Sequence, residues 1–581
     1  MAVRRGVWLV LGLIVVAVMV SAAGLIVTAM LVGREPQIEG NSTLILKVSG
    51  DLQEVEPGGV IGQFFDPPPT VRSVVEALRK AKVDRRVSSV VIRPTGTAAL
   101  WAKVQEIRDA VADFKTSGKT VIGFLEYGGE QEFYLVSACD KVFLMPTASL
   151  DLTGIASYEL FLRGTLDKIG AFPDALHVGE YKTAANTFTE KKFTPTHREM
   201  AQSLNTDLYE QLVKGLGEGR HKSADEMRTL IDHGPYLPED AVRAGLVDDV
   251  AYEDELDDKV QLGKGTTRFI TDAEYRKVTA ASVGLNRGPR IAVIYVVGVI
   301  TSGSSNYDST SGQSVGSDTM ADILRKARAD DSIKAIILRV DSPGGSAIAS
   351  DVIWREVMLT RQTKPVIASM SDVAASGGYY ISMPAHSIVA QPATLTGSIG
   401  VVLVKFAIGG TLQKLGMNME RVTSGRYADM YAPDKVFTKE ERAKVLEQMQ
   451  ATYDAFVEKA AAGRHTTPER IDAIGQGRVW TGAQGKQIGL VDELGGLDRA
   501  IVIAKQQAKI DASSEVELVI YPQRKSFFEL VESPFGASGG SGMLGALLGM
   551  RDAKAVQTLT APLRLFRRGE PLALMPNVFV R

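Results

Sequence analysis

The sequence contains a serine, Ser376, whose surroundings would suit a nucleophile. The segment "SDVAASGGYY" (371–380) places Ser376 among alanines and glycines, directly after an apolar run. Small neighbours expose a hydroxyl and let another backbone approach it closely. A serine nucleophile needs a base to take its proton, and no histidine stands at an obvious position. Taken alone, the stretch fits a helix N-cap as well as a nucleophile.

An internal duplication helps to identify the missing base. The segment "VSSVVIRPTG" (87–96) aligns with "IKAIILRVDS" (333–342), an offset of 246 positions. The same offset aligns residues 132–146 with residues 378–392. Such a preserved register indicates a tandem duplication. The two copies should share the residues that build the fold, so differences between them point to function.

The copies differ in a complementary way at two positions. Ser376 aligns with Glu130 in the first copy, and Lys182 in "GEYKTAANTF" aligns with Ala428 in the second. A lone lysine is usually a solvated surface charge, but here each copy has one half of a serine–lysine pair. A lysine can act as a base where apolar burial lowers its pKa. We therefore expect Lys182 to accept the proton of Ser376.

Other candidate bases fit the pattern less well. Lys191 and Lys192 in "TEKKF" are expected on the surface, and His386 should lie at the far end of the helix that Ser376 opens. His221 and His465 occur in both copies as "GRH", which indicates a role in the fold. No context singles out the remaining histidines, His177, His197 and His233.

Glycines near Ser376 could stabilise a developing negative charge. The second copy has "DSPGGSA" (341–347) after a predicted strand, where the first has "TGTAALW" (95–101). Consecutive glycines permit positive φ and free N–H groups, as an oxyanion hole requires, although Pro-Gly-Gly is also an ordinary turn. The Gly377 N–H, at the start of the predicted helix, would point at incoming negative charge.

The elements that must position these residues alternate between strands and helices. Short β-branched runs alternate with segments of helical period, which predicts α/β modules with parallel strands joined by crossovers. We expect a first module at 44–281 and a second at 289–522, with a linker near 282–290. The Gly/Ser-rich segment 523–581 is predicted to be a flexible tail.

Composition excludes several classes of function. The chain has 581 residues, a net charge of −2 and 45% hydrophobic residues, without a polybasic nucleic-acid signature. Its single cysteine, Cys139, excludes an intramolecular disulfide and a Cys-rich metal site. There is no HExxH motif and no Walker-type loop. We expect no nucleic-acid partner, no metal and no cofactor.

The N-terminus predicts a membrane anchor. Residues 7–32 contain no charged side chain and are long enough to cross a bilayer as one helix. Arg4 and Arg5 outweigh Arg34, so residues 1–6 should stay cytoplasmic and the remaining mass should lie on the other side. The alternative is a cleavable signal peptide, for which "SAA" would suit the cleavage site.

Four motifs resemble those of the signal peptide peptidase A (protease IV) family in its long, duplicated bacterial form. They are "DSPGGSA", "AASGGYYIS", "TLTGSIGV" and "GEYKTAANTF", and the resemblance covers residues 44–522 plus the anchor. It implies two Clp-protease/crotonase-like ββα-superhelix modules. It also implies Ser376 as nucleophile, Lys182 as general base, Gly345 and Gly377 as oxyanion donors, and Ser398 as the hydroxyl that holds the amine of the lysine.

The resemblance further implies a membrane-anchored serine endopeptidase that degrades signal peptides after signal peptidase has released them. It implies a homotetramer at the bacterial inner membrane, with dyads formed where modules of neighbouring protomers meet. The sequence itself leaves open whether the dyad forms within or between chains. Two alternatives remain, a crotonase-like acyl-CoA hydratase or isomerase using carboxylates such as Glu130, and a catalytically silent membrane scaffold whose interaction surface includes 523–581.

Overall fold

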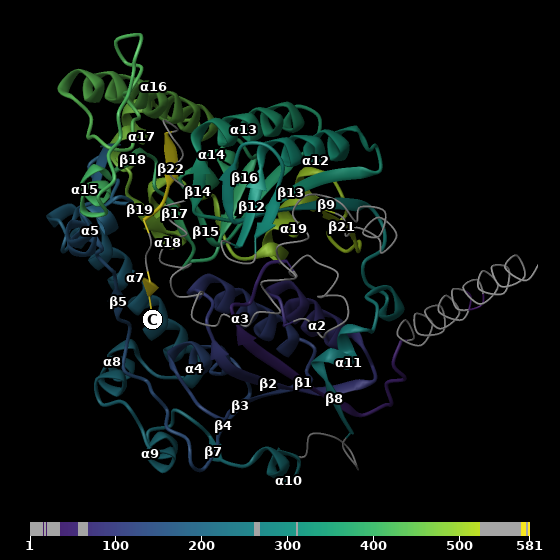
Figure 1. Ribbon diagram of the computed structural model, residues 1–581. Coiled ribbons are helices and arrows are strands. Elements are labelled where there is room, and N and C mark those ends of the chain that lie inside the picture. Colours follow the sequence, from purple (N-terminus) through teal and green to yellow (C-terminus); the bar gives the residue numbers. More distant parts are fainter. Residues whose placement is uncertain are drawn as a thin grey trace, which may run out of the picture.

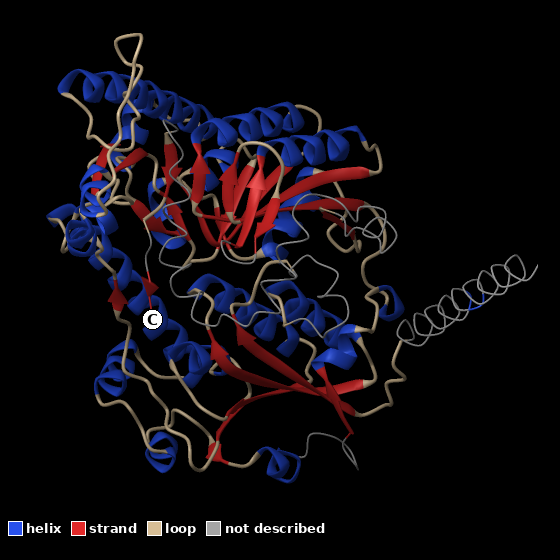
Figure 2. Cartoon of the chain, viewed as in Figure 1, coloured by secondary structure: helices blue, strands red, loops and turns tan. Residues whose placement is uncertain are grey.

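Two α/β modules make up most of the protein. The structure is a computed structural model that describes residues 35–55, 68–260, 268–308, 312–522, 571–576 and 579–580, together with residues 16 and 19. The modules lie one above the other in the view of Figure 1. Each has its own sheet with helices packed against it, as Figure 2 shows. The predicted α/β class is confirmed.

The first module contains a six-stranded sheet with the order β7-β4-β3-β2-β1-β8. All neighbouring strands in it are parallel. Its central strands are mainly apolar, as expected for parallel strands covered on both faces. The strands are β1 (Ser42–Gly50), β2 (Val87–Thr97), β3 (Thr120–Leu125), β4 (Lys141–Leu144), β7 (Asp249–Val250) and β8 (Arg268–Thr271).

The second module contains the corresponding sheet, with the order β19-β17-β15-β13-β9-β21 and a branch at β15 formed by β16 and β20. Its strands are parallel, except that β17 and β19 are antiparallel. The strands are β9 (Arg290–Val297), β13 (Ile333–Ser342), β15 (Val366–Ala375), β16 (Ser387–Ala390), β17 (Leu395–Gly397), β19 (Val479–Thr481), β20 (Glu493–Leu494) and β21 (Glu517–Tyr521).

Helices follow the same order in both modules, so the repeat seen in the sequence is a repeat of structure. The first has α2 (Val71–Val83), α3 (Trp101–Lys115), α4 (Glu130–Val136), α7 (Pro195–Arg220), α8 (Ala224–Asp232) and α9 (Pro238–Arg243). The second has α12 (Ser317–Ala329), α13 (Ala347–Arg361), α14 (Gly377–Ser382), α16 (Lys439–Gly463), α17 (Pro468–Ile474) and α18 (Gly482–Ile488). Further short elements are β5 (Ser157–Tyr158), α5 (Arg163–Ile169), α6 (Asn186–Thr189), η2 (Glu253–Glu255), α10 (Leu256–Val260), α11 (Asp272–Arg276), η3 (Ala281–Val283), α15 (Gly409–Lys414), α19 (Leu497–Gln507) and β23 (Phe579–Val580).

A third sheet joins the two modules and includes a strand from the C-terminal segment. Its order is β11-β12-β10-β14-β22-β18-β6. The strand β6 comes from the first module, and the other strands except β22 come from the second. They are β6 (Phe172–Val178), β10 (Val299–Thr301), β11 (Asn306–Asp308), β12 (Gly312–Gly316), β14 (Gly344–Ser346), β18 (Val401–Ala407) and β22 (Leu572–Leu574).

A buried charged cluster also connects the modules. The guanidinium of Arg339, on β13, donates to both carboxylate oxygens of Glu54 at 2.7 and 2.8 Å. It also donates to Glu106, on α3, at 2.6 Å. All three side chains are buried. Because the two carboxylates belong to the first module and Arg339 to the second, these ion pairs cross the interface between the modules, and removing one partner would leave a buried charge unpaired.

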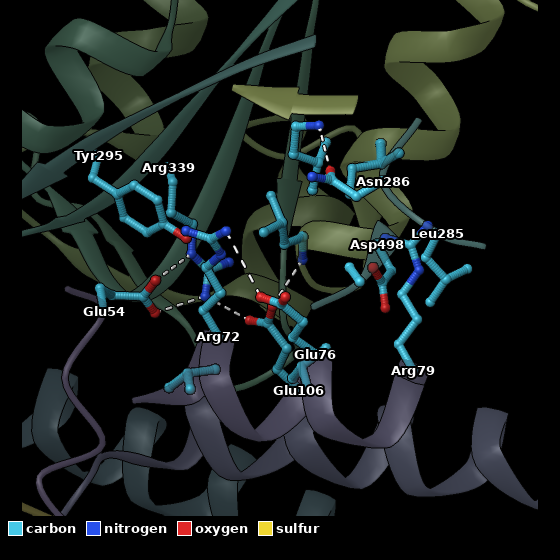
Figure 3. A pocket seen from close by; sticks show the side chains of 16 residues that line it. Glu54, Arg72, Glu76, Arg79, Glu106, Leu285, Asn286, Tyr295, Arg339 and Asp498 are labelled. Carbon is cyan, nitrogen blue, oxygen red and sulfur yellow. Dashed lines mark hydrogen bonds and ion pairs between the residues drawn. The ribbon is translucent and has the colours of Figure 1, made fainter. Parts of the chain in front are cut away.

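Figure 3 shows a cavity beside this cluster. Its walls come largely from α2 and α19, with Arg72, Glu76, Arg79 and Asp498 among the lining residues. Neither Lys182 nor Ser376 lines it. The cavity therefore belongs to the contact between modules and lies apart from the predicted chemistry.

Several sequence predictions concern residues at the ends of the chain. The predicted cytoplasmic segment 1–6 and anchor 7–32 lie outside the described residues, except for residues 16 and 19. In the described part of the chain, no helix combines the length and apolar character needed to cross a membrane. Most of the predicted tail also lies outside it. Residues 571–576 do not fit the prediction of a flexible tail, because their apolar side chains are buried around β22.

Candidate functional site

Ser376 connects β15 to α14 in an uncommon backbone conformation. Its φ is 54° and its ψ is −112°, and the residue is completely buried. Strained backbone of this kind persists where the surrounding structure holds it, often at functional sites. Although Ser376 occupies the N-cap position of α14, its side chain makes no capping hydrogen bond. The N-cap interpretation therefore does not account for its hydroxyl.

Pairing between β6 and β18 brings Lys182 to this hydroxyl. The two strands are antiparallel, with Val178 opposite Val401. The chain that leaves β6 thus lies beside the chain that enters β18. Lys182 follows β6 by four residues and Ser398 precedes β18 by three. The structure therefore joins the lysine of the first module and the serine of the second within one chain.

The amine of Lys182 has three oxygen neighbours. Its Nζ lies 2.8 Å from Ser376 Oγ, 2.8 Å from the backbone oxygen of Ser398 and 3.0 Å from Ser398 Oγ. A neutral amine has two N–H donors and one lone pair. When the two Ser398 oxygens accept the two N–H groups, the lone pair is left to accept the proton of Ser376. Ser398 thus orients the amine of Lys182.

The surroundings of Lys182 favour its neutral form. The side chain is fully buried, and burial lowers the pKa of Lys182 well below its usual value. Among the described residues no carboxylate forms an ion pair with it. A neutral amine in hydrogen-bonding contact with a serine hydroxyl is the arrangement that general-base activation requires.

A loop that the sequence analysis did not single out holds Lys182 in place. The carbonyl of Gln476 accepts from Tyr181 N–H at 2.7 Å, and Arg478 accepts from Ser398 N–H at 2.7 Å. Between them, Gly477 has a φ of 77°, and a Cβ atom there would lie 2.6 Å from backbone atoms of Lys182. Only glycine fits at position 477, because any side chain there would collide with Lys182. The sequence signal for this loop was the two glycines Gly475 and Gly477 in "IGQGRVW", but glycines this close together are common in turns.

The predicted oxyanion donors lie together beside Ser376. Gly345 has a φ of 154° on the short strand β14, and Gly377 is the first residue of α14. A Cβ atom on Gly377 would lie 3.1 Å from Gly345 N and 3.0 Å from Gly344 Cα. The two backbones therefore converge, and side chains at these positions would separate them.

The other candidates from the sequence lie elsewhere. Lys191 is exposed and pairs with Asp167 at 3.0 Å, and His386 accepts from the backbone of Val366 at 3.1 Å. Glu130 accepts from Thr153. His221 and His465 have φ of 54° and 52° where α7 and α16 end, which confirms a role in the fold. Lys192 is exposed, and His197 pairs with Glu159. The backbone oxygens of Gly179 and Thr229 accept hydrogen bonds from the Nδ1 atoms of His177 and His233.

Known proteases are similar to this chain over most of its length. A model of Peptidase family S49 matches residues 113–267 and 358–511. The relative "Serine protease SPPA, chloroplastic" from Arabidopsis thaliana is 36% identical over 466 residues, which cover 79% of this chain and 69% of the relative. "Protease 4" from Salmonella typhi is 34% identical over 451 residues, 75% of this chain and 72% of the relative. Among solved structures, ClpP1 from Listeria monocytogenes matches 35% of this chain and 89% of its own, at 13% identity and a TM-score of 0.22 that is too low to support an argument.

Proposed function

This chain belongs to peptidase family S49 and is a serine protease, and from that premise we propose that it cleaves peptide bonds with Ser376 as nucleophile and Lys182 as general base. The observation that carries the proposal is the 2.8 Å contact between Lys182 Nζ and Ser376 Oγ in a buried site. The sequence supports the same assignment, because the first copy has the lysine without the serine and the second copy has the serine without the lysine.

The reaction follows from the geometry of these groups. Neutral Lys182 takes the proton of Ser376 as Oγ forms a bond to the peptide carbonyl carbon. The N–H groups of Gly345 and Gly377 stabilise the oxyanion, each contributing about 3 kcal/mol. The charged lysine then protonates the leaving amine as the C–N bond breaks. Water, deprotonated by Lys182, attacks the acyl-enzyme and restores Ser376.

The substrates that we propose are signal peptides left in the membrane after signal peptidase has released them, together with other apolar peptides. One relative, from Enterococcus faecium, is named "Putative signal peptide peptidase SppA" and is 33% identical over 195 residues, 33% of this chain. Apolar side chains adjoin the dyad on both sides, including Ala184 and Leu395. Such surroundings suit the apolar core of a signal peptide.

We also propose the location and assembly of the protease. The uncharged segment 7–32 would anchor it in the inner membrane with residues 1–6 in the cytoplasm and the catalytic modules outside the cytoplasmic face. The assembly that we propose is a homotetramer. Exposed apolar side chains such as Val422 and Leu415 support contacts with other subunits or the membrane surface.

Two substitutions test the assignment. Ser376→Ala and Lys182→Ala should each lower kcat/KM for a synthetic signal-peptide substrate by at least about a thousandfold, because each removes a partner in bond formation. Lys191→Ala, which changes an exposed lysine in the same segment, should retain full activity. Covalent labelling by a fluorophosphonate should occur in the wild type and be lost in Ser376→Ala. Full activity in either dyad variant would refute the proposal.

A further inference from the structure

A strand from the C-terminal segment lies in the middle of the third sheet. The strand β22 is hydrogen-bonded to β14 on one side and to β18 on the other, antiparallel to both. These two neighbours carry or adjoin the groups of the site, because β14 contains Gly345 and β18 follows Ser398. Without β22, the sheet would have a gap one strand wide between β14 and β18. Figure 1 shows β22 beside β14 and β18.

The register of β22 places Ala573 opposite Gly345. The hydrogen bonds on either side are Ala347 N–H to Pro571 oxygen at 3.3 Å and Met575 N–H to Pro343 oxygen at 2.9 Å. In antiparallel strands, hydrogen-bonded pairs recur at every second residue. The pair between them, Gly345 with Ala573, is therefore also a hydrogen-bonded pair, and the oxyanion donor Gly345 faces the Ala573 carbonyl.

The second predicted oxyanion donor, Gly377, lies near the same carbonyl. A Cβ atom on Gly344 would collide with the carbonyl oxygen of Ala573 and would lie 2.6 Å from Gly377 N. The Ala573 oxygen and the Gly377 N–H thus approach one another around Gly344. The carbonyl of Ala573 thus lies close to the backbone of both predicted oxyanion donors.

Apolar contacts hold this segment on both sides of the dyad. Leu572 and Leu574 pack with Ala184 and Ala185, just after Lys182. Met575 packs with Ala375, the residue before Ser376. All of these tail side chains are buried. The segment therefore uses both an extended backbone and apolar pockets, which is how a peptide binds by strand addition.

We propose that residues 571–575 are an internal competitor that occupies the substrate groove of the protease and must leave before a peptide can bind. The inference rests on the proposed function, since it identifies the gap between β14 and β18 as the place where substrate lies. A substrate that replaces β22 would be an extended apolar peptide with a small residue at the position of Ala573 and leucine-like side chains beside it.

The test uses the full chain with the substitution Leu574→Asp. A charged side chain cannot remain in the apolar pocket, so the tail should leave the groove. For a quenched peptide containing Leu-Ala-Leu, KM should fall about tenfold or more while kcat stays unchanged, and fluorophosphonate should label Ser376 faster by a similar factor. Ala573→Pro, which removes the N–H that pairs with β14 without adding a charge, should give the same result.

A peptide comprising residues 570–577 provides a complementary measurement. It should inhibit Leu574→Asp competitively, and the same peptide carrying Leu574→Asp should not. The matched control in the chain is Leu237→Asp, which changes an exposed leucine of the first module and should leave KM at the wild-type value.

The outcomes separate the two proposals. If hydrolysis is unchanged in Ser376→Ala, the proposed function fails and this inference fails with it. If hydrolysis depends on Ser376 but both tail variants keep the KM and labelling rate of the wild type, the proposed function stands and the internal competitor is refuted.

Discussion

At the scale of single residues, the site depends on one buried amine that has no carboxylate partner among the described residues. Burial lowers the pKa of Lys182, and the two oxygens of Ser398 accept hydrogen bonds from its amine. The same burial has a cost in stability. The unfolded chain binds a proton on this lysine below a pH of about 10.5, and the folded chain releases it.

This linkage predicts opposite effects of Lys182→Met on activity and stability. Activity should be lost, and the Tm at neutral pH should rise, because folding no longer requires the release of a proton. The difference in Tm between variant and wild type should shrink as the pH rises toward 10.5, since the unfolded wild type then loses its proton too. In the wild type, kcat/KM should fall as the pH drops through the folded pKa of Lys182.

Calorimetry across this pH range and a pH–rate profile are the measurements. Lys191→Met serves as the control, because it removes an exposed amine outside the site and should change neither curve. A lower Tm for Lys182→Met at neutral pH would show that the lysine is charged in the folded protein.

At the scale of elements, strand register and one loop determine where the dyad forms. The pairing of β6 with β18 brings two distant segments together. The loop at Gln476–Arg478 then fixes them, with Gly477 in contact with the backbone of Lys182. Neither contact follows from local sequence, because each joins residues of different modules.

Gly477→Ala should therefore lower kcat/KM by about a hundredfold, since a displacement of about 1 Å in a catalytic group can have that effect. The added Cβ would have to push Lys182 away from Ser376. Gly416→Ala is a matched control, because Gly416 also has positive φ (70°) but nothing lies within 4 Å of its would-be Cβ. Steady-state kinetics of the two variants are the measurement. Equal activity in both would mean that the loop does not position the base.

The sequence predicted the part of the site that differs between the two copies. Ser376 and Lys182 stood out because each is missing from the other copy, and the two glycine pairs stood out because other residues occupy the aligned positions in the first copy. Ser398 was expected only from the family resemblance. Gly477 and β22 were not foreseen, because their roles depend on tertiary contacts. In particular, the short apolar run 572–575 has no counterpart in the first copy and lies beyond a Gly/Ser-rich segment.

At the scale of the whole molecule, the two modules are joined by buried polar contacts as well as by shared strands. Arg339 pairs with Glu54 and Glu106. Burial opposes the charged form of Glu54, yet the Arg339 guanidinium holds the pKa of that carboxyl below its usual value. Nearby, Lys103 of α3 pairs with Asp341 of β13 at 2.8 Å. The dyad thus depends on an interface whose charges are paired across the modules.

Replacing Arg339 should weaken the contact between the two modules. Arg339→Met should lower the free energy of unfolding by about 3–5 kcal/mol, because two buried carboxylates lose their partner. Arg228→Met, which removes an exposed ion pair with Glu210, should cost less than about 1 kcal/mol. Urea denaturation of both variants is the measurement. A similar small cost in both would mean that apolar contacts alone hold the modules together.

The division of Lys182 and Ser376 between the two modules also matters while the protein is being made. The ribosome finishes the lysine-bearing half first, and at that stage the growing chain has a base but no hydroxyl for it to activate. Synthesis must pass β18 before β6 has a strand to pair with. With the proposed dyad, a nascent chain could not damage itself or its neighbours by hydrolysis, since activity would arise only when the late half has been translated and has assembled with the early one.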